Sequence, residues 1–286
     1  MIDQQRSTTN FKPLELVKGF DCDYDWEANQ PYEKQEFFQK IEAIVTKYFY
    51  GFFHPLGRRL LAGELTPHEL CFLAIQEHRY YSFTTWWNAS KLAQSDTLEQ
   101  QRMLHNPLLD ELGTDLVDVN GEPAHSELHL RYCESLGLTR AEVLNSPLVP
   151  GVAVAVTELL RIMRERPVFE SLACSNLVVE RMRPVHYTKL LKTFDSHYQW
   201  VPKFGLRFYE VHATLDTEHE SLGRRIVSQY LYDKRNQDGM FSAVLRSLCL
   251  RLVMYDSIDQ ALNNPGQVGL LPWPNFPREP WPRPQT

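Results

Sequence analysis

The sequence lacks the features of several large protein classes. Its 5 cysteines are scattered and form no C-x-x-C pair, which predicts neither a disulfide framework nor a thiolate zinc site. The longest apolar run, around residues 152–156, is far too short to cross a bilayer. The first ten residues are polar and carry no apolar stretch typical of a secretory signal. These absences predict a soluble protein of the reducing cytoplasm that does not bind membranes.

Basic residues are in the minority. The chain has 30 Lys and Arg residues against 36 Asp and Glu residues, a formal net charge of -6, which offers no basic surface for nucleic acid. No nucleic-acid partner is therefore expected. The 286 residues are 43% hydrophobic and 12% aromatic, enough to bury a sizeable core. The aromatic N-terminal segment is also compatible with a homodimer.

Alternation of apolar and polar residues at period two, the mark of a half-buried strand, does not occur over any length. Apolar residues instead recur at helical spacing, and short helices or turns are expected at 57–65 and 139–145. Thr66 with Glu69 predicts a capping box at a helix start. The longer predicted helices cover 33–53, 66–92, 98–112, 125–138, 152–166, 169–194, 203–235 and 242–262. The pattern predicts an all-α domain of about seven or eight helices over residues 32–262, with an N-terminal arm (1–31) and a Pro-rich C-terminal tail (263–286).

Three side chains of the kind that bind metals share one face of a predicted helix. At about 100° per residue, His212, Asp216 and His219 fall within roughly 60° of one another. Val211 and Leu215 lie close to the same face, so the polar side chains are expected to be buried, where imidazole and carboxylate groups need partners. The ordinary alternative is a solvated, charged helix face. Mixed nitrogen and oxygen donors suit iron or manganese.

A ferritin-like bundle would require two Glu-x-x-His pairs on inward-facing helices. The sequence has this spacing once, at Glu122 and His125, but Pro123 places Glu122 at a helix entrance and not inside a helix. The ferritin-like arrangement is therefore not favoured.

Several segments together resemble the haem-oxygenase-like diiron oxidases, the superfamily that also contains the TenA thiaminases and the PqqC-type quinone-forming oxidases. The segments are residues 63–70 followed by an aromatic helix, Asp-Glu-Leu-Gly at 110–113, His-Ser-Glu-Leu at 125–128 leading to Leu-Gly-Leu at 136–138, and H-x3-D-x2-H at 212–219. The resemblance covers about residues 33–260. It implies a haem-oxygenase-like (TenA/PqqC-like) bundle whose metal ligands are Glu111, His125, Glu180, His212, Asp216 and His219.

Two of these matches depend on local context. Glu180 is matched through its spacing to Pro184, four residues further on. The loop between Glu111 and His125 is longer than in many relatives, so Glu111 has three possible substitutes, namely Asp110, Asp115 and Glu122.

The resemblance also implies a function. It points to a non-haem diiron oxidase or oxygenase that uses two Fe(II), or Mn, with O2 as co-substrate. The implied substrate is a small amine or an amino-acid-derived molecule, and the implied reaction is N-oxygenation or oxidative C–C or C–N bond cleavage in specialised metabolite biosynthesis. Substrate contacts are expected from the aromatic helix and from segments that flank the ligands, namely Glu77, His78, Tyr80, Tyr187 and Arg207.

Three alternatives remain open. A metal-free oxidase like the PqqC-type members would share the fold but would have no need of the three carboxylates. A haem oxygenase would use a single proximal histidine, for which His54 is the candidate, and would leave the triplet at 212–219 unexplained. A non-enzymatic helical interaction protein would use its acidic helix faces and Pro-rich tail for contacts.

Overall fold

The computed structural model describes residues 19–115 and 121–264 of the chain, and most of the expected tail and the first part of the expected arm lie outside these ranges. The described residues are mainly helical and form no β-strand, with one isolated bridge between Gly113 and Pro123. The elements are α1 (Lys34–Tyr48), α2 (Tyr50–Phe53), α3 (Pro55–Ala62), α4 (Pro67–Tyr81), α5 (Thr84–Ala93), α6 (Leu98–Leu112), α7 (His125–Ser135), α8 (Arg140–Asn145), α9 (Pro150–Glu165), α10 (Val168–Ser175), η2 (Asn176–Glu180), α11 (Arg181–Ser196), η3 (Lys203–Leu206), α12 (Arg207–Val227), η4 (Ser228–Tyr230) and α13 (Lys234–Asn263).

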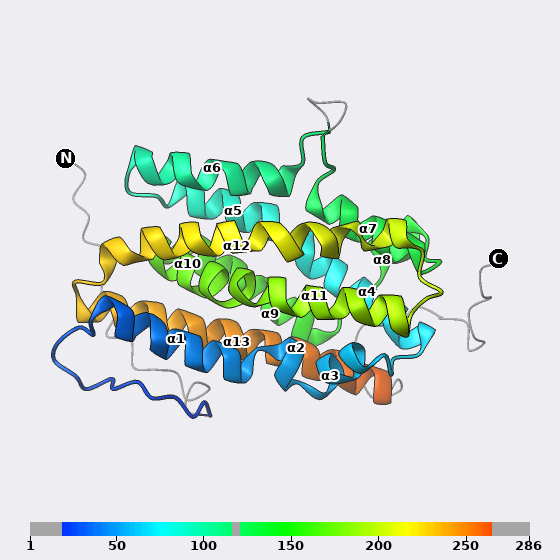
Figure 1. The fold of residues 1–286 in the computed structure, drawn as a ribbon, viewed down its shortest axis with the longest axis horizontal. Coiled ribbons are helices and arrows are strands. Elements are labelled where there is room, and N and C mark those ends of the chain that lie inside the picture. The colour runs from blue at the N-terminus through cyan, green and yellow to red at the C-terminus, as the bar shows by residue number, and fades with distance from the viewer. Residues whose placement is uncertain (1–18, 116–120, 265–286) are drawn as a thin grey trace.

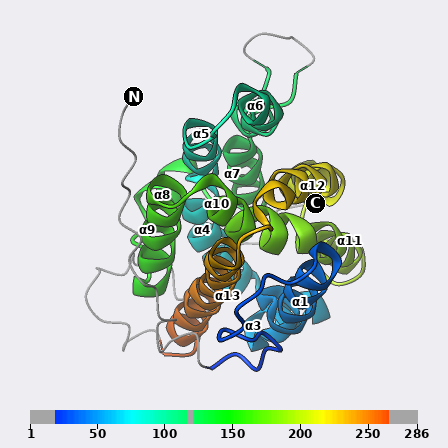
Figure 2. The same ribbon diagram turned by 90° about the vertical axis from the view of Figure 1, so that its left-hand side faces the viewer.

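The helices pack around α10, all eight residues of which are buried. Helix α10 contacts α13, α12 and α9, and these surround it in the end-on view (Figure 2). The long helix α13 also packs along α9, and α11 runs beside α12 (Figure 1). Helices α5 and α6 form an outer pair. Helix α5 contacts α9 and α10, and α6 contacts α7 and α12. The predicted all-α class is confirmed.

Several long predicted helices are divided by turns, so the fold has more helical segments than expected. The predicted helix over 66–92 ends at Tyr81 and resumes at Thr84 as α5. The last helix begins at Lys234 and not near Ser242, because Asp233 caps it by accepting a hydrogen bond from the Arg235 amide (2.8 Å). Hydrophobic periodicity did not predict these turns, because apolar residues keep their helical spacing across them.

The predicted capping box at the start of α4 is confirmed. The Thr66 amide donates to Glu69 Oε2 (2.8 Å), and the Glu69 amide donates to Thr66 Oγ1 (3.3 Å). Pro67 occupies the first helical position, where a missing N–H costs nothing.

The described part of the N-terminal arm packs on its own chain. The Tyr24 ring stacks on Phe241 of α13 with centroids 4.0 Å apart, and its hydroxyl donates to Asp238 (2.7 Å). This contact fixes the arm against α13. None of the described helices has both the length and the apolarity required to cross a membrane.

Candidate metal centre

Three helices bring Glu111, His125 and His212 together inside the bundle. One donor atom from each side chain lies within 4.8 Å of the other two, and all three residues are buried. Glu111 comes from the last turn of α6, His125 is the first residue of α7, and His212 lies on α12. We call these three residues the Glu111 group.

Neighbouring side chains hold the Glu111 group in position. The Thr84 hydroxyl donates to Glu111 Oε2 (2.6 Å), and His212 Nδ1 donates to the Phe208 carbonyl (2.8 Å). The second bond fixes the tautomer of His212 so that Nε2 is left with a free lone pair, the arrangement found in metal-binding histidines. Nδ1 of His125 lies 3.5 Å from Glu111 Oε2 and makes no hydrogen bond within the described chain.

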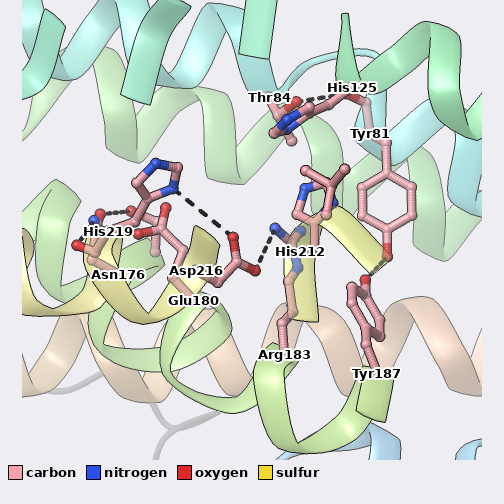
Figure 3. A network of polar contacts seen from close by, with 12 residues as sticks. Tyr81, Thr84, His125, Asn176, Glu180, Arg183, Tyr187, His212, Asp216 and His219 are labelled. Carbon is pink, nitrogen blue, oxygen red and sulfur yellow. Dashed lines mark hydrogen bonds and ion pairs between the residues drawn. The ribbon is translucent and has the colours of Figure 1, made fainter. Parts of the chain in front are cut away.

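The remaining expected ligands form a second cluster, which we call the Asp216 group: Glu180, Asp216 and His219. Asp216 Oδ1 lies 3.9 Å from His219 Nδ1, and its Oδ2 lies 3.7 Å from the Arg183 guanidinium (Figure 3). His219 Nε2 lies 3.0 Å from Asp110 Oδ2. Buried Glu180 Oε2 and Asp216 Oδ2 have no hydrogen-bond partner among the described residues. Unpartnered carboxylate oxygens inside a protein are costly, and a bound cation would satisfy them.

Electrostatic coupling is strong in the Glu111 group. Burial alone would raise the pKa of the Glu111 carboxyl, but the adjacent His125, together with His212 and Thr84, holds that pKa well below its ordinary value. Burial lowers the pKa of His125, and the Glu111 carboxylate more than offsets this, so the pKa of His125 is raised. The pKa of His212 is far below its ordinary value because of burial and the neighbouring His125. A neutral imidazole is the form that binds a metal.

In the Asp216 group the carboxyl pKa shifts in the opposite direction to that of Glu111. Burial raises the pKa of Asp216 to about 7, against the opposing effect of Arg183. Burial would lower the pKa of His219, but Asp110 and Glu180 raise it to about 9. Such pKa shifts in both clusters make this interior the candidate functional site.

A wide helical turn carries Glu180. Residues Asn176–Glu180 form a π-helical turn between α10 and α11, and Pro184 follows in the first turns of α11. Proline has no N–H for the carbonyl four residues earlier, which is that of Glu180, and the wider turn relieves the resulting clash. Such turns often occur at functional sites. Here the turn directs the Glu180 side chain towards α12.

A glycine permits close contact between this turn and α12. A Cβ on Gly223 would lie 2.5 Å from Asn176 Cβ, and the Asn176 amide donates to the His219 carbonyl (2.8 Å). The pairing of Asn176 with Gly223 therefore fixes the distance between the backbone segments that carry Glu180 and His219.

Replacing Gly223 by alanine is expected to destabilise the protein by about 1–3 kcal/mol, because overpacking of a close contact costs this much. Chemical denaturation would measure the change. Gly19→Ala is the matched control, since a Cβ at Gly19 meets nothing within 4 Å. Equal stability of the two variants would contradict the assigned role of Gly223.

The expected substrate residues lie in different surroundings. Tyr187 is buried, and its ring lies 6.1 Å from that of His212, measured between centroids. Glu77 Oε1 accepts a hydrogen bond from the Tyr255 hydroxyl (2.6 Å), and burial raises the pKa of Glu77 to about 7. The His78 ring stacks on His129, with centroids 5.7 Å apart.

Tyr80 and Arg207, the other two residues expected to contact the substrate, lie in contrasting positions. The Tyr80 hydroxyl accepts a hydrogen bond from Arg251 Nη2 (2.6 Å), and both residues border a small cavity beside Glu111 and Glu180. Arg207 was expected to contact the substrate, but it is half exposed and forms ion pairs with Glu122 and Glu210. Arg207 lies five residues before His212, which places it nearly on the opposite side of the helix.

The structure places Glu111 and its three possible substitutes, Asp110, Asp115 and Glu122, in different surroundings. Glu111 faces His125 and His212, whereas Asp110 faces His219 in the Asp216 group. Asp115 is exposed and Glu122 pairs with Arg207. His54, the candidate haem ligand, has both ring nitrogens engaged: Nδ1 accepts from the Leu56 amide (3.1 Å), and Nε2 contacts Asp256 (2.9 Å).

Three buried cations beside the ligand groups were not expected from the sequence. Lys91, Arg183 and Arg251 are buried cations that border one cavity, of about 20 Å³, beside Glu111 and Glu180. The sequence signal was the spacing of Thr84, Trp87, Asn88 and Lys91, which places the lysine on the inward face of α5. It was not used because a lysine is mostly exposed.

The fold and the site together describe an all-α bundle with a buried imidazole–carboxylate centre. A family model described as "Iron-containing redox enzyme" matches residues 75–252, and the chain belongs to this family. All the expected ligands lie within the matched segment.

Known proteins agree with this assignment. Pyrroloquinoline-quinone synthase of Ectopseudomonas mendocina is 27% identical over 216 residues, which cover 74% of this chain and 82% of the relative. A Shewanella denitrificans domain of unknown function with a heme oxygenase-like fold has a TM-score of 0.67 at 16% identity, covering 84% of this chain and 99% of that one. A TenA homolog from Pseudomonas syringae has a TM-score of 0.61 at 11% identity, with the same coverage of both chains. The superfamily expected from the sequence is confirmed, and the chain is an oxidoreductase of this superfamily.

Proposed function

We propose that this protein is a non-haem diiron oxidase or oxygenase that oxidises a small amine or an amino-acid-derived substrate with O2. The observation that carries the proposal is the interior position of six imidazole and carboxylate side chains from α6, α7, η2 and α12, with several donor atoms left unpartnered. Specialised metabolite biosynthesis is the proposed setting, and a cytoplasmic location is proposed with it.

The donor set suits two iron ions. The Glu111 group offers two imidazoles and one carboxylate, and the Asp216 group offers one imidazole and two carboxylates, a mixture that iron or manganese accepts. Two ferrous ions held there would supply reducing electrons and open coordination positions for dioxygen. Three carboxylates offset most of the charge of two divalent ions.

The protein's own side chains position these donors and keep water away. Thr84 and the Phe208 carbonyl fix Glu111 and His212, as described above. Tyr81 and Tyr187 join their hydroxyls at 2.7 Å and close one side of the Glu111 group together with Phe208, whose ring lies 4.3 Å from that of His212. The cavity beside Glu111 that Tyr80, Trp87 and Arg183 border has a volume of about 20 Å³, room for about one water molecule, so an organic substrate would bind there only after these side chains move.

The test is metal content combined with oxygen uptake. Protein reconstituted anaerobically with saturating Fe(II) is expected to hold about two irons per chain and to consume O2 in a single turnover. Candidate amines and amino acids that accelerate this uptake would identify the substrate class. Stoichiometric haem, or protein without bound metal after reconstitution, would overturn the proposal.

A metal-free oxidase is the second candidate, and the similarity to pyrroloquinoline-quinone synthases favours it. Under this alternative the six side chains would bind an organic substrate directly. The same reconstitution separates the two functions, because a metal-free oxidase keeps its activity after chelation whereas the diiron enzyme loses it.

A further inference from the structure

Lys91 is a buried cation within the proposed metal centre. Its side chain is 2% exposed, and its ammonium group lies 3.7 Å from Glu180 Oε1. The same group donates hydrogen bonds to Asn176 Oδ1 (3.1 Å) and Ser175 Oγ (3.3 Å). These three acceptors belong to α10 and the π-helical turn, so Lys91 of α5 is tied to the segment that carries a metal ligand.

The two ligand groups differ in their charged neighbours. Each member of the Asp216 group has a partner of complementary charge within 4.0 Å: Glu180 has Lys91, Asp216 has Arg183, and His219 has Asp110.

The Glu111 group has no such lysine or arginine partner. Over residues 19–115 and 121–264, Glu111 forms its ion pair with His125, a member of its own group, at 3.5 Å. A metal ion that enters the Glu111 group therefore displaces no lysine or arginine from its carboxylate, whereas one that enters the Asp216 group meets both Lys91 and Arg183.

We propose that Lys91 is a built-in counterion that competes with a metal ion at the Asp216 group. The inference rests on the proposed metal function. A divalent ion that approaches Glu180 meets the ammonium group at close range, where like charges repel strongly away from bulk water. The centre therefore binds one divalent ion tightly through the Glu111 group. A second ion binds at the Asp216 group with lower affinity, because Lys91 must first give up Glu180.

Anaerobic titration of the full chain with Co(II), followed by visible absorption and by calorimetry, tests this proposal. The wild type is expected to bind a first ion tightly and a second at least ten-fold more weakly. Lys91→Met keeps the length of the side chain and removes its charge, and Lys91→Gln retains a donor for Asn176. Both variants are expected to tighten the second binding step at least ten-fold and to leave the first unchanged.

Lys34→Met is the matched control, since Lys34 is exposed on α1 and its loss changes the net charge equally. Circular dichroism of the metal-free variants checks that they are folded, and Lys91→Gln provides the test if Lys91→Met does not fold. Equal affinities for both ions in the wild type, or an unchanged second step in both variants, would overturn the role of Lys91 while leaving the diiron proposal intact. Failure of the wild type to bind any Co(II) would overturn both.

Discussion

Replacing His212 by alanine is expected to abolish metal-dependent oxygen consumption. The substitution leaves the Glu111 group with one imidazole and one carboxylate, too few donors to hold an ion tightly. Removing a residue that only hydrogen-bonds to a metal ligand lowers metal affinity or activity by about 10–100-fold. Removing the ligand itself is therefore expected to lower oxygen consumption by at least about 100-fold. Alanine favours a helix, so α12 is expected to remain intact.

Iron content after anaerobic reconstitution and single-turnover oxygen uptake measure this effect. His105→Ala serves as the control because His105 is exposed on α6, away from both ligand groups. An iron content equal to that of the wild type in His212→Ala would show that the Glu111 group is not a metal site.

Replacing His186 by leucine is expected to remove part of the protein's acid sensitivity. His186 is 2% exposed, and neither ring nitrogen has a hydrogen-bond partner among the described residues. The rings of Phe49, Phe52 and Tyr187 surround it. Burial, together with Arg183 and Lys189, lowers the pKa of His186 to about 3.

The sign of the pH effect follows from this shift. The unfolded chain binds a proton at His186 below pH about 6.5, whereas the folded chain excludes that proton until about pH 3, so the folded state loses stability as the pH falls through this window. The slope is about 1.4 kcal/mol per pH unit. Between pH 7 and pH 5, the wild type is therefore expected to lose about 2 kcal/mol more than His186→Leu.

Urea denaturation of the metal-free proteins at the two pH values measures the difference. His197→Leu is the control, since His197 is exposed and its replacement should leave the pH dependence unchanged. A loss in His186→Leu as large as in the wild type would show that His186 does not carry this acid sensitivity.

The sequence predicted the buried polar face of α12 well because one local rule governs it. His212, Asp216 and His219 share a face through helical spacing alone, and the structure buries all three. Glu111 and Glu180 come from helices whose mutual packing no local pattern encodes. Their assignment needed the resemblance to a known family.

The parts that were missed depend on tertiary context. The break between α4 and α5 places Thr84 beside Glu111, yet the aromatic pattern runs across the break without a signal. Lys91 was overlooked because a buried lysine is stabilised only by partners from distant helices. Arg207 was chosen for its closeness in sequence to His212, which does not ensure closeness in space.

The π-helical turn at Asn176–Glu180 joins α10 and α11 into one continuous helical segment whose two halves pack against different helices. Helix α10 before it packs against α13, and α11 after it packs against α12. A regular helix fixes the angular phase between its two ends, whereas one extra residue in a turn rotates everything beyond it by about 100°. The turn therefore lets α11 face α12 at an angle that α10, packed on α13, does not dictate.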